Sequence, residues 1–158
     1  MWAPNFQADQ TACGRPLRLI NVVDEHTREA LVMHAGRSMS ADQTVARLEA
    51  LIAARGRAPK FLRIDNGPEL TSHALRDWCR FSGTRTVFIE PGAPWKNPFV
   101  ESFHARVRDE LLNGEQFSRL AEAQVLIDDW REDYNTRRPH SALGMRTPEA
   151  FAAECAAI

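Results

Sequence analysis

Short apolar runs near the start of the chain predict three β-strands in succession. They cover residues 2–6, 17–23 and 30–35, and residues 24–28 form the turn between the last two. Apolar runs of this length, bounded by turn residues, are typical of strands. Three strands joined by short connections indicate one sheet.

After these strands, the hydrophobic pattern alternates between helix and strand. A capping box of Ser40 and Gln43 begins a helix, and Gly56 with Pro59 ends it. The next segments are predicted to be a strand at 60–64, a helix at 72–81 and a strand at 86–90. The order predicts an α/β protein with a mixed sheet and helices on both faces.

The second half of the chain predicts three further helices. They are separated from the sheet by residues 91–98, PGAPWKNP, whose prolines exclude strand pairing. The first helix carries Glu101, the second covers residues 120–134 with one apolar face, and a short third begins near Thr147 and Pro148. The core stripe of the first helix comprises Val100, Phe103, Val107 and Leu111.

The composition indicates a globular protein but does not identify its binding partners. The chain has 158 residues, of which 44% are hydrophobic and 26% charged, as expected for one globular domain. The net charge of -1 gives no indication of nucleic-acid binding, although local basic patches remain compatible with it. The three cysteines lack metal-ligand spacing and are predicted to be reduced thiols. With no membrane span and no leader segment, a cytoplasmic protein is expected.

Two carboxylates stand out because of where they fall in the predicted elements. Asp65 ends a strand and precedes Asn-Gly-Pro, so it either caps that turn or projects from the rim of the sheet. Glu101 lies in the first turn of a helix, where the macrodipole alone favours an acidic residue. Together, however, they resemble a site for hard divalent cations, which prefer oxygen ligands.

A polar stripe runs along the helix that carries Glu101, beside the core stripe. It comprises Asn97, Glu101, His104 and Arg108. His104 and Arg108 either extend the site toward an anionic substrate or form an ordinary solvated helix surface. The sequence leaves both readings open.

Three segments resemble the integrase core of bacterial insertion-sequence transposases, which are related to retroviral integrases. They are RIDNGPEL, NPFVESFHARVRDELLN and DYNTRRPHSALGMRTPEAF, and the resemblance runs from about Trp2 to Phe151. Asp65 and Glu101 have 35 residues between them, the spacing of the Asp-Asp-(35)-Glu signature. The resemblance implies a ribonuclease H-like fold, a three-layer α/β/α arrangement with a mixed five-stranded sheet.

The resemblance also implies a chemistry and partners. It implies DNA cleavage and strand transfer by transesterification, with two Mg²⁺ (or Mn²⁺) ions held by three carboxylates. It implies insertion-element ends and target DNA as partners, a homo-oligomer, and a nucleoid-associated place in the cytoplasm. Asp65 and Glu101 match the second and third carboxylates.

The first carboxylate of the family is replaced. The family motif Trp-x-x-Asp-Phe corresponds to Trp2 through Phe6, and Asn5 stands at the aspartate position. An amide oxygen is a weak Mg²⁺ ligand and should not bridge two ions, so impaired catalysis is expected. Asp9 could substitute only after an even-numbered register shift, which would displace the apolar residues of the strand. The alternative is an inactive fragment that acts as a DNA-binding or oligomerising module.

Basic residues elsewhere in the chain allow two interpretations each, phosphate contact or a role without DNA. Lys96 and Asn97 lie in the loop before the helix of Glu101, and Lys96 either contacts phosphate or is solvated. Arg137, Arg138 and His140 match an Arg-Pro-His motif of the family and either contact phosphate or tie the tail to the body.

The expected organisation is a single integrase catalytic core over residues 1–158. The core proper is expected over about 2–115, with a C-terminal helical extension at 116–158. Because the chain starts four residues before Asn5, an upstream helix-turn-helix region is expected to be absent. A separate helix-turn-helix subunit would then be a further partner.

Overall fold

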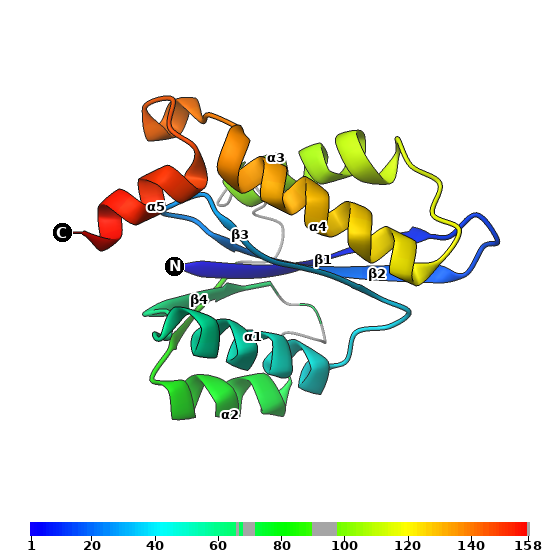
Figure 1. The fold of residues 1–158 in the computed structure, drawn as a ribbon. Coiled ribbons are helices and arrows are strands. Elements are labelled where there is room, and N and C mark those ends of the chain that lie inside the picture. Colours follow the sequence, from blue (N-terminus) through cyan, green and yellow to red (C-terminus); the bar gives the residue numbers. More distant parts are fainter. Residues whose placement is uncertain (66, 68–71, 90–97, 158) are drawn as a thin grey trace.

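The computed structural model of the chain describes residues 1–65, 67, 72–89 and 98–157 (Figure 1). Its strands are β1 (Trp2–Gln10), β2 (Pro16–Asp24), β3 (Ala30–Gly36), β4 (Phe61–Ile64) and β5 (Arg85–Phe88). Its helices are α1 (Ala41–Arg55), α2 (His73–Ser82), α3 (Pro98–Val107), α4 (Leu120–Arg137) and α5 (Pro148–Ala156). A π-helical segment (Arg108–Leu112) continues α3, and a short 3₁₀ turn (Ser141–Leu143) follows α4.

The five strands form one mixed sheet in the order β3-β2-β1-β4-β5. β1 and β2 pair antiparallel from Trp2 opposite Asp24 to Gln10 opposite Pro16, and β2 pairs antiparallel with β3. β4 adds to β1 in parallel, and β5 adds to β4 in parallel. The parallel additions need crossovers, which α1 and α2 provide.

Helices cover both faces of this sheet. α1 and α2 lie on one face, and α3, α4 and α5 lie on the other (Figure 1). Two separate clusters of buried residues follow from this arrangement, one between the sheet and each helical layer. The predicted three-layer α/β/α architecture with a mixed five-stranded sheet is therefore confirmed.

The local signals in the sequence act as predicted. The Ser40 hydroxyl accepts from the Gln43 amide at 3.2 Å, while the Gln43 side chain accepts from the Ser40 amide at 2.8 Å, so the capping box is complete. Gly56 ends α1 at φ 68°, a left-handed conformation that favours glycine. The predicted core stripe of α3 is buried throughout: Val100, Phe103, Val107 and Leu111 are at most 4% exposed.

Several boundaries differ from prediction because tertiary pairing sets them. β1 runs to Gln10, four residues beyond the predicted end, since its polar second half pairs with β2 along its whole length. α4 continues to Arg137, past the predicted end at residue 134. The predicted last residue of the fifth strand, Glu90, lies outside the described residues.

Residues after 115 contribute to the same core as the strands and α3. Phe117, Ala123, Ile127, Trp130 and Tyr134 share one buried cluster with Ala3, Leu19 and Phe103. The Phe103 and Tyr134 rings meet edge-on with centroids 5.3 Å apart, and Trp130 stacks on Tyr134 at 5.2 Å. These aromatic contacts fix α4 against α3. In the part of the chain described, no helix combines the length and apolar character that a membrane span requires.

Candidate active site

Parallel pairing brings Asn5 and Asp65 to the same level of the sheet. Trp2 of β1 is in register with Leu62 of β4, so three residues farther along each strand Asn5 lies level with Asp65. Neighbouring strands are about 4.8 Å apart. Trp2 and Leu62 both belong to the core on the α1 side, and an odd number of residues reverses the face. Both candidate ligands therefore face the α3 side.

A buried hydrogen-bond chain holds α3 over this part of β1. Gln7, two residues after Asn5 on the same face, donates from Nε2 to the carbonyl oxygen of His104 at 3.1 Å. Asn21 of β2 donates from Nδ2 to the Gln7 side-chain oxygen at 2.7 Å. Glu101 lies about one turn before His104 on α3 and is exposed. The structure thus brings Asn5, Asp65 and the helix of Glu101 to one face.

Local hydrogen bonds leave oxygen atoms available at this site. Asp65 accepts from the Gly67 amide at Oδ1, 2.8 Å away, so it does cap the turn as one reading proposed. No hydrogen bond to its second carboxylate oxygen occurs among the residues that the structure describes, so this oxygen is a candidate ligand atom. The side-chain oxygen of Asn5 accepts from the Phe6 amide at 2.6 Å, which occupies one lone pair of an already weak ligand.

The donor set has the right chemistry for a hard cation but one carboxylate too few. Asp65 and Glu101 supply carboxylate oxygens, and Asn5 supplies an amide oxygen. Within the described residues, no group of three His, Cys, Asp or Glu side chains is placed to hold a metal ion. Because position 5 is an amide, the three residues fit Mg²⁺ or Mn²⁺ less well than three carboxylates would.

His104 and Arg108 lie on α3 and its continuation, with different environments. Burial lowers the pKa of His104 to about 4, and the nearby Arg108 charge adds to this effect. Its Nε2 is buried and has no hydrogen-bond partner among the described residues. The imidazole is therefore neutral at pH 7, which weakens its case as an anion ligand. Arg108 is exposed and reaches the Ala8 carbonyl at 3.5 Å, near β1.

The basic residues after α4 are divided between surface and structural contacts. Arg138 forms ion pairs with Glu110 and with Asp133, the latter at 2.8 Å, and lies over the Trp130 ring at 5.1 Å. These contacts tie the end of α4 to α3, in line with the structural reading of that residue. Arg137 is exposed at the end of α4. Lys96 and Asn97 lie outside the described residues.

His140 anchors the segment that follows α4. Its backbone forms a bridge with Arg146, and its ring meets Tyr134 edge-on at 5.1 Å. Burial, followed by the charges of Arg106, Arg28 and Arg138, lowers the pKa of His140. The ring is thus held between the tail and the body of the protein.

Sequence reasoning missed Gln7 and Asn21, the two residues that link the strands to α3. They are 6% and 1% exposed, although polar residues are usually at the surface. The available signal was their position, since Gln7 follows Asn5 by two residues and therefore shares its face. A polar residue on the inward face of a strand needs a partner, and here the partner is a helix carbonyl.

Comparison with known proteins shows the family of the chain. Residues 6–94 and residues 82–148 each match a family described as "Integrase core domain". An uncharacterized 39.2 kDa protein of insertion element IS476 from Xanthomonas euvesicatoria is 41% identical over 152 residues, covering 96% of this chain and 44% of that protein. An uncharacterized 31.7 kDa protein of insertion element IS407 from Burkholderia multivorans is 39% identical, covering 98% of this chain and 55% of that protein. The chain thus spans about half the length of these relatives.

Solved structures share the fold at low sequence identity. The HTLV-2 integrase catalytic core domain in complex with magnesium superposes with a TM-score of 0.73 at 14% identity, covering 95% of this chain and 93% of that one. The simian T-cell lymphotropic virus intasome contains a chain with a TM-score of 0.76 at 16% identity, covering 95% of this chain and 52% of that one. This likeness confirms the ribonuclease H-like fold predicted from the sequence.

Proposed function

This chain belongs to the integrase core domain family, and we propose that it is the catalytic core of an insertion-sequence transposase whose metal site is weakened by Asn5. The observation that carries the proposal is the convergence of Asn5, Asp65 and the helix of Glu101 on one face of the sheet. The substrate is DNA, at the element ends and at the target. The working form is a homo-oligomer, since two element ends are joined in one event.

The residues of this chain would act by holding and orienting the reacting groups. Asp65 and Glu101, with the Asn5 oxygen, would hold Mg²⁺ or Mn²⁺, whose bound charge would favour activation of an attacking oxygen and stabilise the leaving one. The Gly67 amide fixes one oxygen of Asp65, so the other is oriented away from the turn. The hydrogen bond from Gln7 to the His104 carbonyl fixes α3, and with it the position of Glu101.

The loss of one negative charge explains why Asn5 should weaken metal binding at this site. Replacing aspartate by asparagine removes one unit of negative charge from the ligand set while leaving its size almost unchanged. Mg²⁺ releases bound water reluctantly and relies on carboxylates to hold it. Two carboxylates should therefore bind the metal more weakly than three, and the rate of DNA cleavage should fall with metal occupancy.

Nicking of supercoiled plasmid tests this proposal directly. Wild type, Asn5→Asp and Glu101→Gln would be compared in Mn²⁺, with Asn113→Asp as the control that adds the same carboxylate at an exposed position after the π-helical segment. We expect that only the Asn5→Asp variant nicks the plasmid above the background measured with Glu101→Gln. Equal nicking by wild type and Asn5→Asp would show that Asn5 does not limit the site.

Metal binding gives a second readout that does not depend on activity. Mn²⁺ should raise the melting temperature of Asn5→Asp more than that of wild type or Asn113→Asp, because a ligand that binds only the folded state stabilises it by mass action. The same shift in all three proteins would mean that position 5 is not a ligand.

A second candidate function follows from the same residue. With Asn5 in place, the chain could be a module that binds DNA or oligomerises without cleaving it, with a separate helix-turn-helix subunit as a further partner. In this case DNA binding by wild type would be retained, and neither wild type nor Asn5→Asp would nick the plasmid. Candidates for phosphate contact under either function are Lys96, Asn97, Arg108 and Arg137.

The division of the chain is proposed on the same basis. A core of about residues 2–115 would carry the metal ligands, and residues 116–158 would act as a helical extension that packs on it. Because Phe117 and Tyr134 are buried in the common core, deletion of the extension should unfold the protein rather than release an active fragment.

A further inference from the structure

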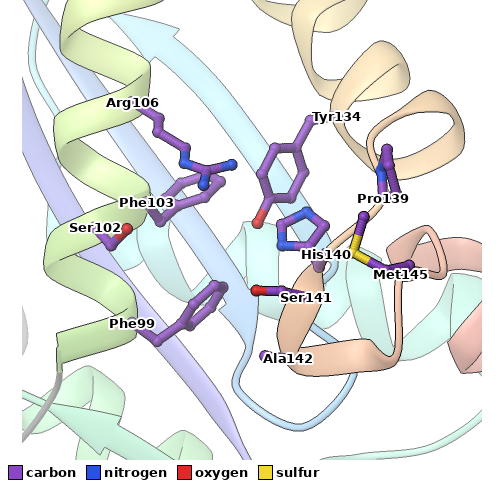
Figure 2. A pocket seen from close by; sticks show the side chains of 10 residues that line it. All are labelled: Phe99, Ser102, Phe103, Arg106, Tyr134, Pro139, His140, Ser141, Ala142 and Met145. Carbon is purple, nitrogen blue, oxygen red and sulfur yellow. The ribbon is translucent and has the colours of Figure 1, made fainter.

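A pocket of about 330 Å³ lies between α3, α4 and the segment after α4, and none of the proposed metal ligands lines it (Figure 2). Phe99, Phe103 and Arg106 come from α3, and Tyr134 comes from α4. The far wall is made by the tail, including His140 and Ser141. This pocket has no role in the function proposed above.

Two polar atoms in this pocket lack partners. The Tyr134 residue is 1% exposed, and its hydroxyl has no hydrogen-bond partner among the described residues, nor does Nε2 of His140. A buried polar group without a partner destabilises the fold. Figure 2 shows the Tyr134 hydroxyl and the His140 imidazole turned toward each other beside the Ser141 hydroxyl. Tyr134 is held by Phe103 and Trp130, so its hydroxyl cannot easily turn elsewhere.

Positive charge surrounds the same space. Arg106 lines the pocket, and the Arg28 guanidinium lies over the Phe99 ring with its carbon 4.2 Å from the ring centroid. The charges of Arg106, Arg28 and Arg138 all act on His140 in addition to burial. Three guanidinium groups from three different parts of the chain are thus close to one imidazole.

The nearby acidic side chains are already paired with other arginines. Glu110 binds Arg138, and the two glutamates of the turn that carries Arg28 bind elsewhere, Glu25 to Arg63 and Glu29 to Arg55. No ion pair of Arg28 or Arg106 occurs among the residues that the structure describes. The pocket is therefore left with an excess of positive charge.

We propose that this pocket binds a phosphate group of the DNA backbone, with Arg106 and Arg28 supplying charge and the Tyr134 and Ser141 hydroxyls donating hydrogen bonds. A phosphate has several acceptor oxygens and suits a mixture of guanidinium and hydroxyl donors. The ligand would satisfy the Tyr134 hydroxyl, which has no hydrogen-bond partner among the described residues.

This inference rests on the proposed function, because α3 would carry both Glu101 and the pocket. Ser102 follows Glu101 directly, and Arg106 lies five residues beyond Glu101, about 7.5 Å along the helix axis. Charges along one DNA strand repeat about every 3.4 Å of its axis. Because five residues also turn the helix by about 140°, the DNA backbone would have to cross the surface of α3, with one phosphate beside the proposed metal site of Glu101 and another in the pocket.

The test is the salt dependence of DNA binding, measured by fluorescence anisotropy with a labelled duplex in EDTA, so that the metal site contributes nothing. Arg106→Gln should lower the slope of log Kd against log salt by about 0.9, the loss of one phosphate contact. Arg80→Gln is the matched control, since Arg80 lies in the last turn of α2 on the opposite face of the sheet. An equal slope for Arg106→Gln and Arg80→Gln would overturn the proposal.

Tyr134→Phe gives an independent variant that preserves the ring packing. It should weaken DNA binding by about tenfold or more, the effect of one hydrogen bond to a charged phosphate, without changing the salt slope. Unchanged affinity together with a raised melting temperature would show that the hydroxyl serves no ligand, and would also overturn the proposal.

Three further results distinguish free phosphate from DNA phosphate as the ligand, and failure of the pocket assignment from failure of the proposed function. If inorganic phosphate protects wild type against thermal unfolding but DNA affinity is unaffected by Arg106→Gln, the pocket takes free phosphate and the DNA assignment is wrong. If Asn5→Asp nicks plasmid as expected while Arg106→Gln keeps the wild-type slope, only the pocket assignment fails. If wild type does not bind DNA at all and Asn5→Asp does not nick, the proposed function fails with it.

Discussion

The hydrogen-bond chain from Asn21 through Gln7 to the His104 carbonyl allows a quantitative prediction of how much it stabilises the protein. Gln7→Leu keeps a side chain of similar size but removes the donor to the His104 carbonyl and the acceptor for Asn21. Each lost hydrogen bond should cost about 1 kcal/mol. Asn21 is 1% exposed, and its Oδ1 already lacks a partner among the described residues, so it would keep a buried amide without a partner there, at a further cost of about 1–3 kcal/mol. The expected loss of unfolding free energy is about 2–4 kcal/mol, after the small gain from burying leucine.

A double-mutant cycle separates this mechanism from simple loss of packing. In Gln7→Leu with Asn21→Leu no amide is left unpaired, so the double variant should be more stable than the sum of the single effects predicts. The coupling free energy should be about 1–2 kcal/mol, within the range for residues in contact. Urea unfolding followed by tryptophan fluorescence measures all four proteins. Additive effects within about 0.5 kcal/mol would refute the reasoning, because Gln7 and Asn21 would then contribute independently.

Further predictions concern the helix cap, pH and the cysteines. Ser40→Ala should lower the free energy of unfolding by about 1 kcal/mol in urea titrations, because the capping box of α1 is lost. As the pH falls from 6.5 toward 4, His104 should take up a proton more readily in the unfolded chain than in the folded one, so stability should decline by up to about 3 kcal/mol. His104→Gln should reduce that decline, and His73→Gln, a change at an exposed position, should not. Cys13 is exposed and its pKa is lowered by a hydrogen bond with the Thr11 side chain, whereas burial raises the pKa of Cys79 to about 11, so a thiol reagent should label Cys13 first and Cys79 only after unfolding.

Most of the fold could be predicted from the sequence because its signals are local. The spacing of Val100, Phe103 and Val107 identifies the buried face of α3, and the pair Ser40 and Gln43 fixes the start of α1. Such signals depend on residues within one or two turns, whose periodicity the chain itself displays. Strand ends were less predictable, because the pairing partner and not the strand's own residues decides how far β1 extends.

The candidate active site could be predicted from the sequence only in part. The residue types and the spacing of Asp65 and Glu101 were visible along the chain, as was the asparagine at position 5. Their approach to one another needed the parallel register of β1 and β4, which joins residues some sixty positions apart. No local pattern encodes such a register.

Local periodicity and side-chain chemistry were enough to predict the helices, the succession of strands along the chain and the chemical type of each candidate ligand. Which polar groups are buried together depends instead on tertiary packing. Arg138 is held by Glu110 and Asp133, while Tyr134 is left with a buried hydroxyl that has no partner among the described residues. Burial and pairing depend on contacts between distant segments, and these contacts exist only once the sheet and its two helical layers have packed.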